Sequence, residues 1–537
     1  MAVVRRALAA VPVLVWLAVA LFLTTSLAQT LVLPNGRSPD ERQHVDLVVK
    51  AATGQAWPWP DPGTATIATG SGASQFLPSN RLDGPQHLPL VDVPARGERA
   101  SYLDAGGAEP WASVRADGVT RAVRNQLVQH PPLYYLAGGA LLNLWPDWQH
   151  APFDQVWLTL RWANALLLAP LPLLVWAVAR RLRLPAPLPV AAALVPFAVP
   201  ELTRLAASVN NDNLLVLLFA VVTVLLARVV TGDASRRTGV LLGVLTTAAL
   251  LTKGFALLLP AWIALAYAVL WWRSRTRAPV VALGLAAACA VPGALWWVRN
   301  LVLFGRVQPA GNRVHQVSPE PLYSWSDGGW HWLGRLLDRF VTTFAVQDGS
   351  ARLARDASWW GAHVLLVLVL AGLALTLARG ALRRADVAVL VLPTVALGGI
   401  VAAGSWETFT TVHTMAAMQG RYLYGGLAGM AVAALAAAGA LAPRRRRFVS
   451  LGVLGVALVV HAAYQVDVWQ LYWTAPGRSL ADAARAASHL YPFGTGVQAI
   501  VLTAAAAALV TCVVATVRAA SAAAPDDVEI RVRRRGA

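Results

Sequence analysis

Residues 208–230 read SVNNDNLLVLLFAVVTVLLARVV, a polar turn followed by an apolar run with one arginine near its end. The run is long enough to cross a hydrocarbon core about 30 Å thick, because an α-helix rises about 1.5 Å per residue. Comparable runs recur along the 537 residues, of which 57% are hydrophobic and only 13% are charged. The chain is therefore predicted to be an all-α polytopic membrane protein.

The net charge of +18 does not indicate a nucleic-acid partner, because the arginines lie in short clusters between apolar runs. In that position they are typical of topology signals and of contacts with anionic lipid headgroups. Both cysteines, Cys289 and Cys512, fall inside apolar runs, so neither a disulfide framework nor a thiolate metal site is expected. We expect membrane lipids, and no nucleic acid, among the partners.

The basic residues also predict an orientation. Arg5 and Arg6 precede the first apolar run, at about 8–30, which we expect to be a retained helix with its N-terminus in the cytoplasm. If the later arginine clusters are cytoplasmic too, about twelve spans result and both termini lie inside. Besides the first helix, spans are expected at 154–179, 186–203, 213–230, 238–252, 255–272, 279–303, 360–379, 386–404, 421–441, 448–472 and 496–518.

This scheme requires that the short run 132–146 does not cross, so it is predicted to be a juxtamembrane or re-entrant helix on the outer side. A second outer helix is indicated by Trp330, Leu333, Leu337, Phe340 and Phe344, whose helical spacing suits the membrane interface. The predicted parts are a first transmembrane helix (1–30), a large first extracytoplasmic loop with juxtamembrane helices (31–153), a transmembrane core (154–303), an extracytoplasmic loop with an interfacial helix (304–359), further transmembrane helices (360–518) and a cytoplasmic basic tail (519–537).

A polar island, Ser38-Pro39-Asp40-Glu41, follows the first span. Serine as N-cap, proline at the first helical position and glutamate three residues after the cap form a capping box. Such a box would occupy Glu41 and leave Asp40 free, with His44 on the same helix face. Asp40 and Glu41 are therefore candidate catalytic carboxylates, while a purely structural helix start is the alternative.

Other polar islands fall at the outer ends of later spans. His130 opens a proline-rich helix start, and an Asn-Asn-Asp-Asn turn precedes the run at 213. Lys253 and Arg299 lie so close to hydrocarbon that each needs a partner or an anionic ligand. The candidate substrate-binding residues are His44, His130, Asn211, Asp212, Lys253, Arg299, Gln419, Arg421 and Tyr422.

Each island also has a structural explanation. Tyrosines after His130 suit an interfacial belt, and Asx residues suit a helix cap. Lys253 could snorkel to the surface, and Arg421 with Tyr422 could anchor headgroups, although an arginine also offers a planar fork for phosphate. Arg161 and Asn164, early in the second span, are explained equally well by packing between helices.

In order along the chain, PDE after the first helix, HPPLYY, LRWAN, NNDN, TKG and QGRY resemble the pattern of a bacterial family of predicted membrane proteins. That family is similar to the GT-C superfamily of polyprenyl-phosphate-sugar glycosyltransferases. The resemblance covers about residues 30 to 425. It implies a GT-C-like fold in the plasma membrane, with the active site on the extracytoplasmic side and a catalytic carboxylate in the first outer loop, where Asp40 or Glu41 matches.

The resemblance implies transfer of a sugar from a polyprenyl-phosphate carrier to an extracytoplasmic glycan, lipid or protein acceptor. Because the chain ends in a short basic tail, the outer loops are expected to recognise the acceptor. Asp40 would take the proton of an acceptor hydroxyl, and Lys253, Arg299 and Arg421 would stabilise the leaving phosphate. The sequence makes no cofactor certain.

A divalent cation is compatible with the sequence, since carboxylate and imidazole ligands are available, but no two of them form a metal motif. Metal dependence therefore stays open. The candidate ligands are Asp40, His44, His130 and Asp212.

Two other functions remain open from the sequence. A lipid or glycolipid transporter or flippase would place charges or broken helices near the bilayer midplane, whereas Asp40, Glu41 and Asp212 map to helix ends and loops. A lipid-linked glycan ligase or polymerase would share the outer cavity and its basic residues, and only its substrates would distinguish it.

Overall fold

The computed structural model describes residues 9–56, 59–60, 65–71, 95–114, 120–309, 328–345, 374, 377–378, 380, 382–412, 418–474, 477 and 479–521. Most of these residues are helical. The named strands, β1 (Ala112–Val114) and β2 (Thr120–Ala122), pair in one antiparallel sheet. The predicted all-α class is confirmed for the described part of the chain.

Nine helical segments among the described residues are long and apolar enough to cross a membrane. This confirms a polytopic membrane protein. The helices that form these segments are α2 (Val13–Val32), α5 (Phe153–Leu168) with α6 (Leu171–Arg181), α9 (Asp212–Val230), η6 (Gly254–Leu258) with α11 (Leu259–Ser274), α12 (Ala278–Phe304), α15 (Arg384–Val412), η7 (Gly420–Gly426) with α16 (Leu427–Leu441), η8 (Pro443–Phe448) with α17 (Val449–Tyr472), and α19 (Thr495–Ser521).

About twelve spans are expected from the sequence, whereas nine such segments are found among the described residues, and the difference arises at three places. The segment 186–203 is broken into α7 (Leu188–Leu194), η5 (Pro196–Ala198) and α8 (Pro200–Ala206), because a proline removes a helical hydrogen bond and starts each of the last two helices. The segment 238–252 is α10 (Arg236–Leu250), whose 15 residues are too few for a full span. Most of the segment 360–379 lies outside the described residues.

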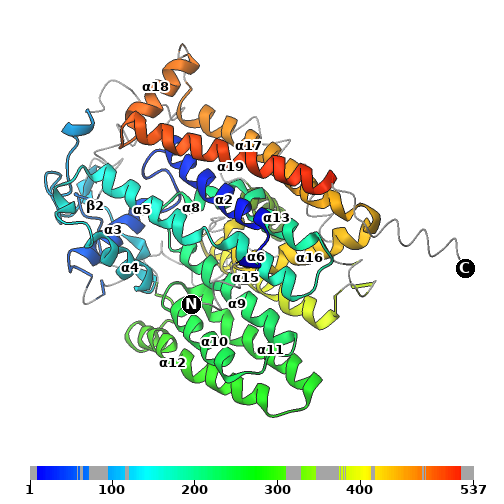
Figure 1. The fold of residues 1–537 in the computed structure, drawn as a ribbon. Coiled ribbons are helices and arrows are strands. Elements are labelled where there is room, and N and C mark those ends of the chain that lie inside the picture. The colour runs from blue at the N-terminus through cyan, green and yellow to red at the C-terminus, as the bar shows by residue number, and fades with distance from the viewer. Residues whose placement is uncertain are drawn as a thin grey trace, which may run out of the picture.

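The central helices form the main apolar core. The segments containing α9 and α16 are mostly buried, whereas most of α12 and α19 is exposed, as expected for helices that face lipid. Figure 1 shows α17 and α19 along one side of the molecule and α10, α11 and α12 at the opposite side. The N-terminal end of α9, at Asp212, therefore lies deep among the helices.

The segment after α2 packs into an ordered body. It is organised around Asp46, which pairs with Lys50 at 2.6 Å and accepts hydrogen bonds from the side chains of Ser71 and Asn125. The run 132–146 forms a helix of only ten residues, α4, as the topology required. The short helices of this body are α3 (Glu41–Ala52), η2 (Arg96–Glu98), η3 (Gln126–Gln129), α4 (Leu133–Leu142) and η4 (Trp148–His150).

Two further helices lie between the spans. The aromatic pattern that begins at Trp330 does form a helix, α13 (Gly329–Ala345). A second one, α18 (Leu480–Leu490), begins with a complete capping box between Ser479 and Asp482. Most of the Pro/Gly-rich stretch 57–97 and all of the tail 522–537 lie outside the described residues.

Candidate active site

The predicted capping box at the start of α3 is wrong. Asp40, not Ser38, is the N-cap residue, and it adopts a left-handed conformation with φ 55° and ψ 14°. The N-cap side chain makes no capping hydrogen bond, and Glu41 is already the first helical residue. Aspartate tolerates this conformation better than most residues, so the turn presents its carboxylate away from the helix end.

Glu41 instead forms a buried ion pair with Arg161 of α5. The guanidinium Nε lies 2.7 Å from Glu41 Oε1, and Nη2 lies 2.7 Å from Oε2. Both side chains have an exposed fraction of 0%. A bidentate contact of this kind is a strong interaction, and it also fixes the orientation of the two groups.

Backbone groups complete the hydrogen bonding of this pair. The carboxylate also accepts from the N–H groups of Gly36 and Val209, each at 3.1 Å. The guanidinium donates to the carbonyl oxygens of Leu33 and Pro34. The pair therefore ties the end of α2 to α3, α5 and the turn before α9, and it leaves no oxygen of the carboxylate open for a substrate.

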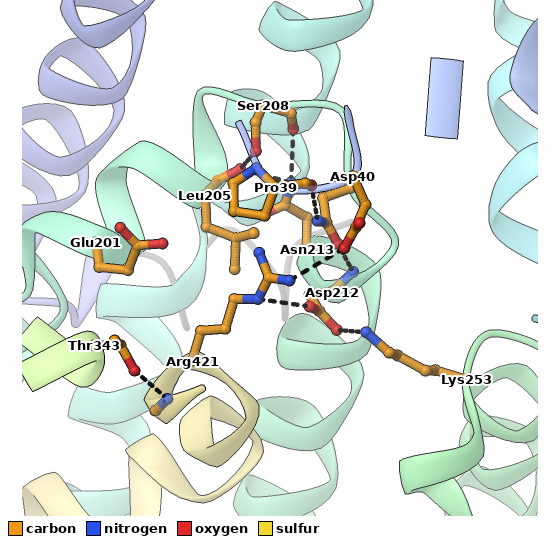
Figure 2. A network of polar contacts seen from close by, with 12 residues as sticks. Pro39, Asp40, Glu201, Leu205, Ser208, Asp212, Asn213, Lys253, Thr343 and Arg421 are labelled. Carbon is orange, nitrogen blue, oxygen red and sulfur yellow. Dashed lines mark hydrogen bonds and ion pairs between the residues drawn. The ribbon is translucent and has the colours of Figure 1, made fainter. Parts of the chain in front are cut away.

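Asp40 lies in a different environment, although it is the adjacent residue. Its side chain is 35% exposed, and its contacts are long: 3.4 Å from Gln126 Nε2 and 3.5 Å from Arg421 Nη2. Figure 2 shows its carboxylate directed toward Arg421 and Asp212. The carboxylate is held loosely and remains accessible.

Asp212, the first residue of α9, joins two cations (Figure 2). Lys253 Nζ lies 2.6 Å from its Oδ1, and Arg421 Nε lies 3.9 Å from its Oδ2. The rings of Phe255 and Tyr422 face the ammonium at 5.6 and 5.3 Å. Lys253 therefore has the partner that a charge near hydrocarbon requires.

Arg421 is buried yet incompletely bonded. It is 3% exposed, and its Nε and Nη1 atoms have no hydrogen-bond partner among the described residues. Buried polar groups are nearly always paired, so two open donors on one guanidinium are unusual. Open donors on a buried guanidinium suit an anionic ligand.

The Asn-Asn-Asp-Asn turn connects the parts of the site. Asn210 accepts from the backbone N–H of Asp212 at 2.9 Å and donates to the carbonyl of Pro39 at 3.3 Å. Asn211 donates to the carbonyl of Thr252. The turn thus fixes the Asp40 turn and the Lys253 segment relative to the start of α9, and the side chain of Asn211 serves this link.

The two histidines lie beside the charged cluster. Burial, and then the charge of Lys253, lower the pKa of His130 to about 3. Burial, followed by the charges of His130 and Lys253, lowers the pKa of His44 well below its usual value. His44 Nδ1 lies 3.0 Å from the hydroxyl of Tyr135, whereas Nδ1 of His130 has no partner among the described residues. Both rings are neutral at pH 7.

Not every candidate residue contacts the charged cluster of Asp40, Asp212, Lys253 and Arg421. Arg299 donates to Asn300 at 3.1 Å and covers the ring of Trp296, and no contact joins it to Asp212 among the described residues. Gln419 is the N-cap residue of η7, and its Oε1 is buried without a partner within the described ranges. Over the part of the chain that the structure describes, no three histidine, cysteine or carboxylate side chains gather as metal ligands.

Sequence reasoning missed two contacts at this site. Gln126 reaches Asp40 from η3, but nothing in its sequence context distinguishes it from an ordinary polar residue. Thr343 of α13 accepts a hydrogen bond from the N–H of Gly420, beside Arg421, at 2.6 Å. Its position, three residues after Phe340 and one before Phe344, was visible only as part of an amphipathic pattern.

Several solved structures are similar to this chain. They include ArnT from Cupriavidus metallidurans in the apo state, with 13% identity over 90% of this chain and 74% of that chain and a TM-score of 0.42. The Archaeoglobus fulgidus oligosaccharyltransferase in complex with Zn and sulfate has 15% identity over 64% of this chain and 44% of that chain, with a TM-score of 0.33. The same organism's AglB, with an inhibitory peptide and a dolichol-phosphate, has 13% identity over 83% and 56%, with a TM-score of 0.33.

The chain spans about half the length of these archaeal enzymes. No sequence among the curated proteins matches it. Residues 151–297, which include Arg161, Asp212 and Lys253, match the family described as dolichyl-phosphate-mannose-protein mannosyltransferase. Over these residues, which are less than half of the chain, the sequence is similar to a glycosyltransferase family, and this confirms the expected resemblance to such enzymes.

Proposed function

We propose that the protein is a membrane glycosyltransferase that moves a sugar from a polyprenyl-phosphate carrier to an extracytoplasmic glycan, lipid or protein acceptor. The observation that carries the proposal is the pairing of an accessible carboxylate with a buried cation whose donors are open. Asp40 Oδ2 lies 3.5 Å from Arg421 Nη2, and Lys253 is linked to the same cluster through Asp212.

In the proposed reaction, the acceptor hydroxyl attacks the anomeric carbon while the bond between that carbon and the phosphate oxygen breaks. Asp40 takes the hydroxyl proton, which a carboxylate within hydrogen-bond reach can do. The carrier phosphate leaves with the bonding electron pair. Its developing charge is stabilised by the open donors of Arg421 and by Lys253, which are fixed before the reaction begins.

Glu41 is the other carboxylate that the resemblance offered, and we propose a structural role for it. Both of its oxygens accept hydrogen bonds from Arg161 at 2.7 Å, and its side chain is inaccessible to solvent. The backbone N–H groups of Gly36 and Val209 also donate to these oxygens, so the carboxylate has no oxygen open to an acceptor hydroxyl. Asp40 is therefore the base in this proposal.

The extracytoplasmic location is part of the proposal. The arginine pattern predicts that the segments carrying Asp40, His130, Asp212, Lys253 and Arg421 all face away from the cytoplasm. Their mutual contacts support a single shared side, since residues that meet in one cluster must lie on one side of the membrane. The organisation that starts with a first helix at 1–30 and an outer segment at 31–153 agrees with it.

The test uses purified protein in lipid nanodiscs, a panel of polyprenyl-phosphate sugars and a panel of envelope acceptors, with product detected by mass spectrometry. The wild type is expected to transfer a sugar from at least one donor. Asp40→Asn is expected to lower the rate by roughly 100- to 10,000-fold, the usual contribution of a general base.

Asp147→Asn is the matched control. Asp147 is also an N-cap aspartate with φ 55° and no capping hydrogen bond, but it is exposed and begins η4, away from the cluster. It should keep the wild-type rate. Full activity in Asp40→Asn would overturn the assignment of the base. Failure of every polyprenyl-phosphate sugar to serve as donor would overturn the proposed reaction.

A further inference from the structure

The helix α13 contacts the turn that carries Arg421. Thr343 Oγ1 accepts a hydrogen bond from the backbone N–H of Gly420 at 2.6 Å, as Figure 2 shows beside Arg421. Four residues further along η7, the hydroxyl of Tyr424 donates to the carbonyl of Phe344 at 2.7 Å. The last turn of α13 therefore holds η7 at two points, one on either side of Arg421.

The approach between the two elements is so close that it requires glycine. A Cβ atom added to Gly420 would lie 2.3 Å from the carbonyl oxygen of Phe340 and 2.4 Å from the backbone nitrogen of Phe344. Both obstacles are backbone atoms, which cannot rotate away as a side chain can. Any larger residue at 420 must move α13 or η7.

The other side of η7 is held just as tightly. A Cβ atom at Gly426 would lie 2.1 Å from the hydroxyl oxygen of Thr394 in α15, and one at Gly425 would lie 2.9 Å from side chains of Leu397 and Phe219. The turn is thus enclosed between α13 on one side and α9 with α15 on the other. Its backbone position is determined by these contacts.

Arg421 depends on that backbone position, because its side chain makes few bonds of its own. Its closest acidic contacts are 3.5 Å from Asp40 and 3.9 Å from Asp212. Two of its three nitrogens have no hydrogen-bond partner in the described part of the chain. A displacement of about 1 Å in an active site can lower the rate by about 100-fold.

The opposite face of α13 has the composition of a membrane-interface helix. Trp330 is 73% exposed and Leu337 is 50% exposed, and the side chains of Arg335 and Arg339 are exposed as well. Exposed apolar and basic residues on one helix suit the boundary between headgroups and hydrocarbon. The same helix therefore presents one face to the surroundings and the other to η7.

We propose that α13 is a positioning element for Arg421: Thr343 and the closely approaching backbone of residues 340–344 hold η7 in the turn that directs the guanidinium at Asp40 and Asp212. Thr343 is a positioning residue and does not contact the reacting atoms. The kinetic consequence rests on the proposed function, because it assumes that Arg421 binds the carrier phosphate.

The kinetic test compares Thr343→Val with Thr343→Ser. Valine keeps the shape of threonine but cannot accept the hydrogen bond from Gly420, whereas serine can. Thr343→Val is expected to lower kcat/KM for the donor by about five- to tenfold, the effect of one hydrogen bond, through a higher donor KM and an unchanged acceptor KM. Thr343→Ser should restore most of the loss.

Thr342→Val is the matched control, because the hydroxyl of Thr342 bonds, within the described residues, only the carbonyl of Asp338 in its own helix. It should behave as the wild type. Gly420→Ala should lower donor kcat/KM by more than Thr343→Val does, while Gly399→Ala should have no effect, because no atom of the described part of the chain lies within 4 Å of its added Cβ. Equal kinetics of Thr343→Val and Thr342→Val would overturn the proposal.

A second measurement is independent of sugar transfer. Hydrogen exchange of the peptide containing Gly420 should become at least tenfold faster in Thr343→Val than in Thr342→Val, with no donor present. Unchanged exchange would overturn the proposal, and so would faster exchange accompanied by unaltered binding of polyprenyl phosphate. If exchange and binding both change but no donor is consumed, the positioning role stands and the proposed reaction fails.

Discussion

Asp40 and Glu41 are neighbours in the chain, and each contacts an arginine, but the two contacts differ in almost every physical respect. Glu41 and Arg161 are inaccessible to solvent and share two hydrogen bonds of 2.7 Å. Asp40 is 35% exposed and lies 3.5 Å from Arg421. The first pair is complete, whereas the second leaves donors and acceptors available.

The difference shows how a fold can support reactivity at one residue with rigidity at the next. The ion pair between Glu41 and Arg161 fixes the backbone turn at residue 40. The Glu41 carboxylate joins four segments, because Gly36, Val209 and Arg161 all donate to it. The Asp40 carboxylate and the Arg421 guanidinium can then lie 3.5 Å apart, which is longer than an ordinary hydrogen bond. The backbone at residue 40 is thus fixed, while the carboxylate itself stays accessible to a substrate.

The comparison is tested most strongly by removing each acid in turn. Glu41→Gln would leave Arg161 buried without its counter-charge and should lower the free energy of unfolding by about 3–5 kcal/mol. Asp40→Asn should change it by less than about 0.5 kcal/mol, since the side chain is partly exposed and loosely held. Thermal unfolding in detergent measures both. Similar losses in the two variants would contradict the distinction.

A double replacement sharpens the first half of the comparison. Arg161→Met alone should be as destabilising as Glu41→Gln, because it also leaves one buried charge unpaired. Combining it with Glu41→Leu removes both charges, and the double variant should recover most of the loss, about 3 kcal/mol. The measurement is a double-mutant cycle of unfolding free energies, with Glu41→Leu and Arg161→Met as the single variants. Additive losses would show that the two side chains do not act as a pair.

On the side of Asp40 and Arg421, the buried His130 beside Lys253 and Asp212 predicts a pH dependence of stability. Burial and Lys253 lower its pKa to about 3, against about 6.5 in the unfolded chain, so the unfolded state binds a proton first as the pH falls. The contribution of the neutral His130 imidazole to the free energy of unfolding is fully present above pH 6.5 and is lost as the pH falls from 6.5 to 3. The free energy of unfolding of His130→Gln minus that of the wild type should be about 2 kcal/mol more positive at pH 5 than at pH 7.5.

Thermal unfolding at the two pH values measures the effect at His130. His150→Gln is the control, because His150 is exposed. If His130→Gln and the wild type lost the same stability on acidification, the imidazole would not be a neutral buried group.

The smallest expected effect concerns the shape of the cation beside Asp40. Arg421→Lys keeps the charge but replaces a planar fork of donors by a point charge. Donor KM should rise by about tenfold, the equivalent of about 1.4 kcal/mol, with little change in thermal stability. Steady-state kinetics with a lipid-linked sugar measure it, with Arg485→Lys as an exposed control. An unaltered donor KM would mean that charge alone matters at position 421.

Much of the helical framework could be predicted from apolar runs, since length and hydrophobicity are local properties of the chain. The exceptions have local physical causes. Pro196 and Pro200 divide one predicted span into short helices, and α10 ends after 15 residues at a turn that presents Lys253. Periodicity alone does not show where a helix stops short.

The site was harder to predict, because its decisive contacts join distant residues. The capping box assigned to Glu41 followed from local spacing, but the side chain pairs with Arg161, which lies 120 positions later. In the sequence alone, packing between helices explains Arg161 equally well. The structure brings Asp40, Asp212, Lys253 and Arg421 into contact and leaves Arg299 outside, and their roles in a reaction remain predictions.

The shortness of α10 has a consequence for the depth at which this chemistry would occur. Fifteen residues rise about 22 Å, roughly 8 Å less than the hydrocarbon thickness of a typical bilayer. If Arg236 and Arg237 anchor its first turn among the headgroups, the ammonium of Lys253 ends below the headgroups of the opposite leaflet. A carrier phosphate would have to sink beneath its neighbouring lipids, or the bilayer would have to thin there. In the first case, protein and lipid rather than bulk water would surround the carrier phosphate.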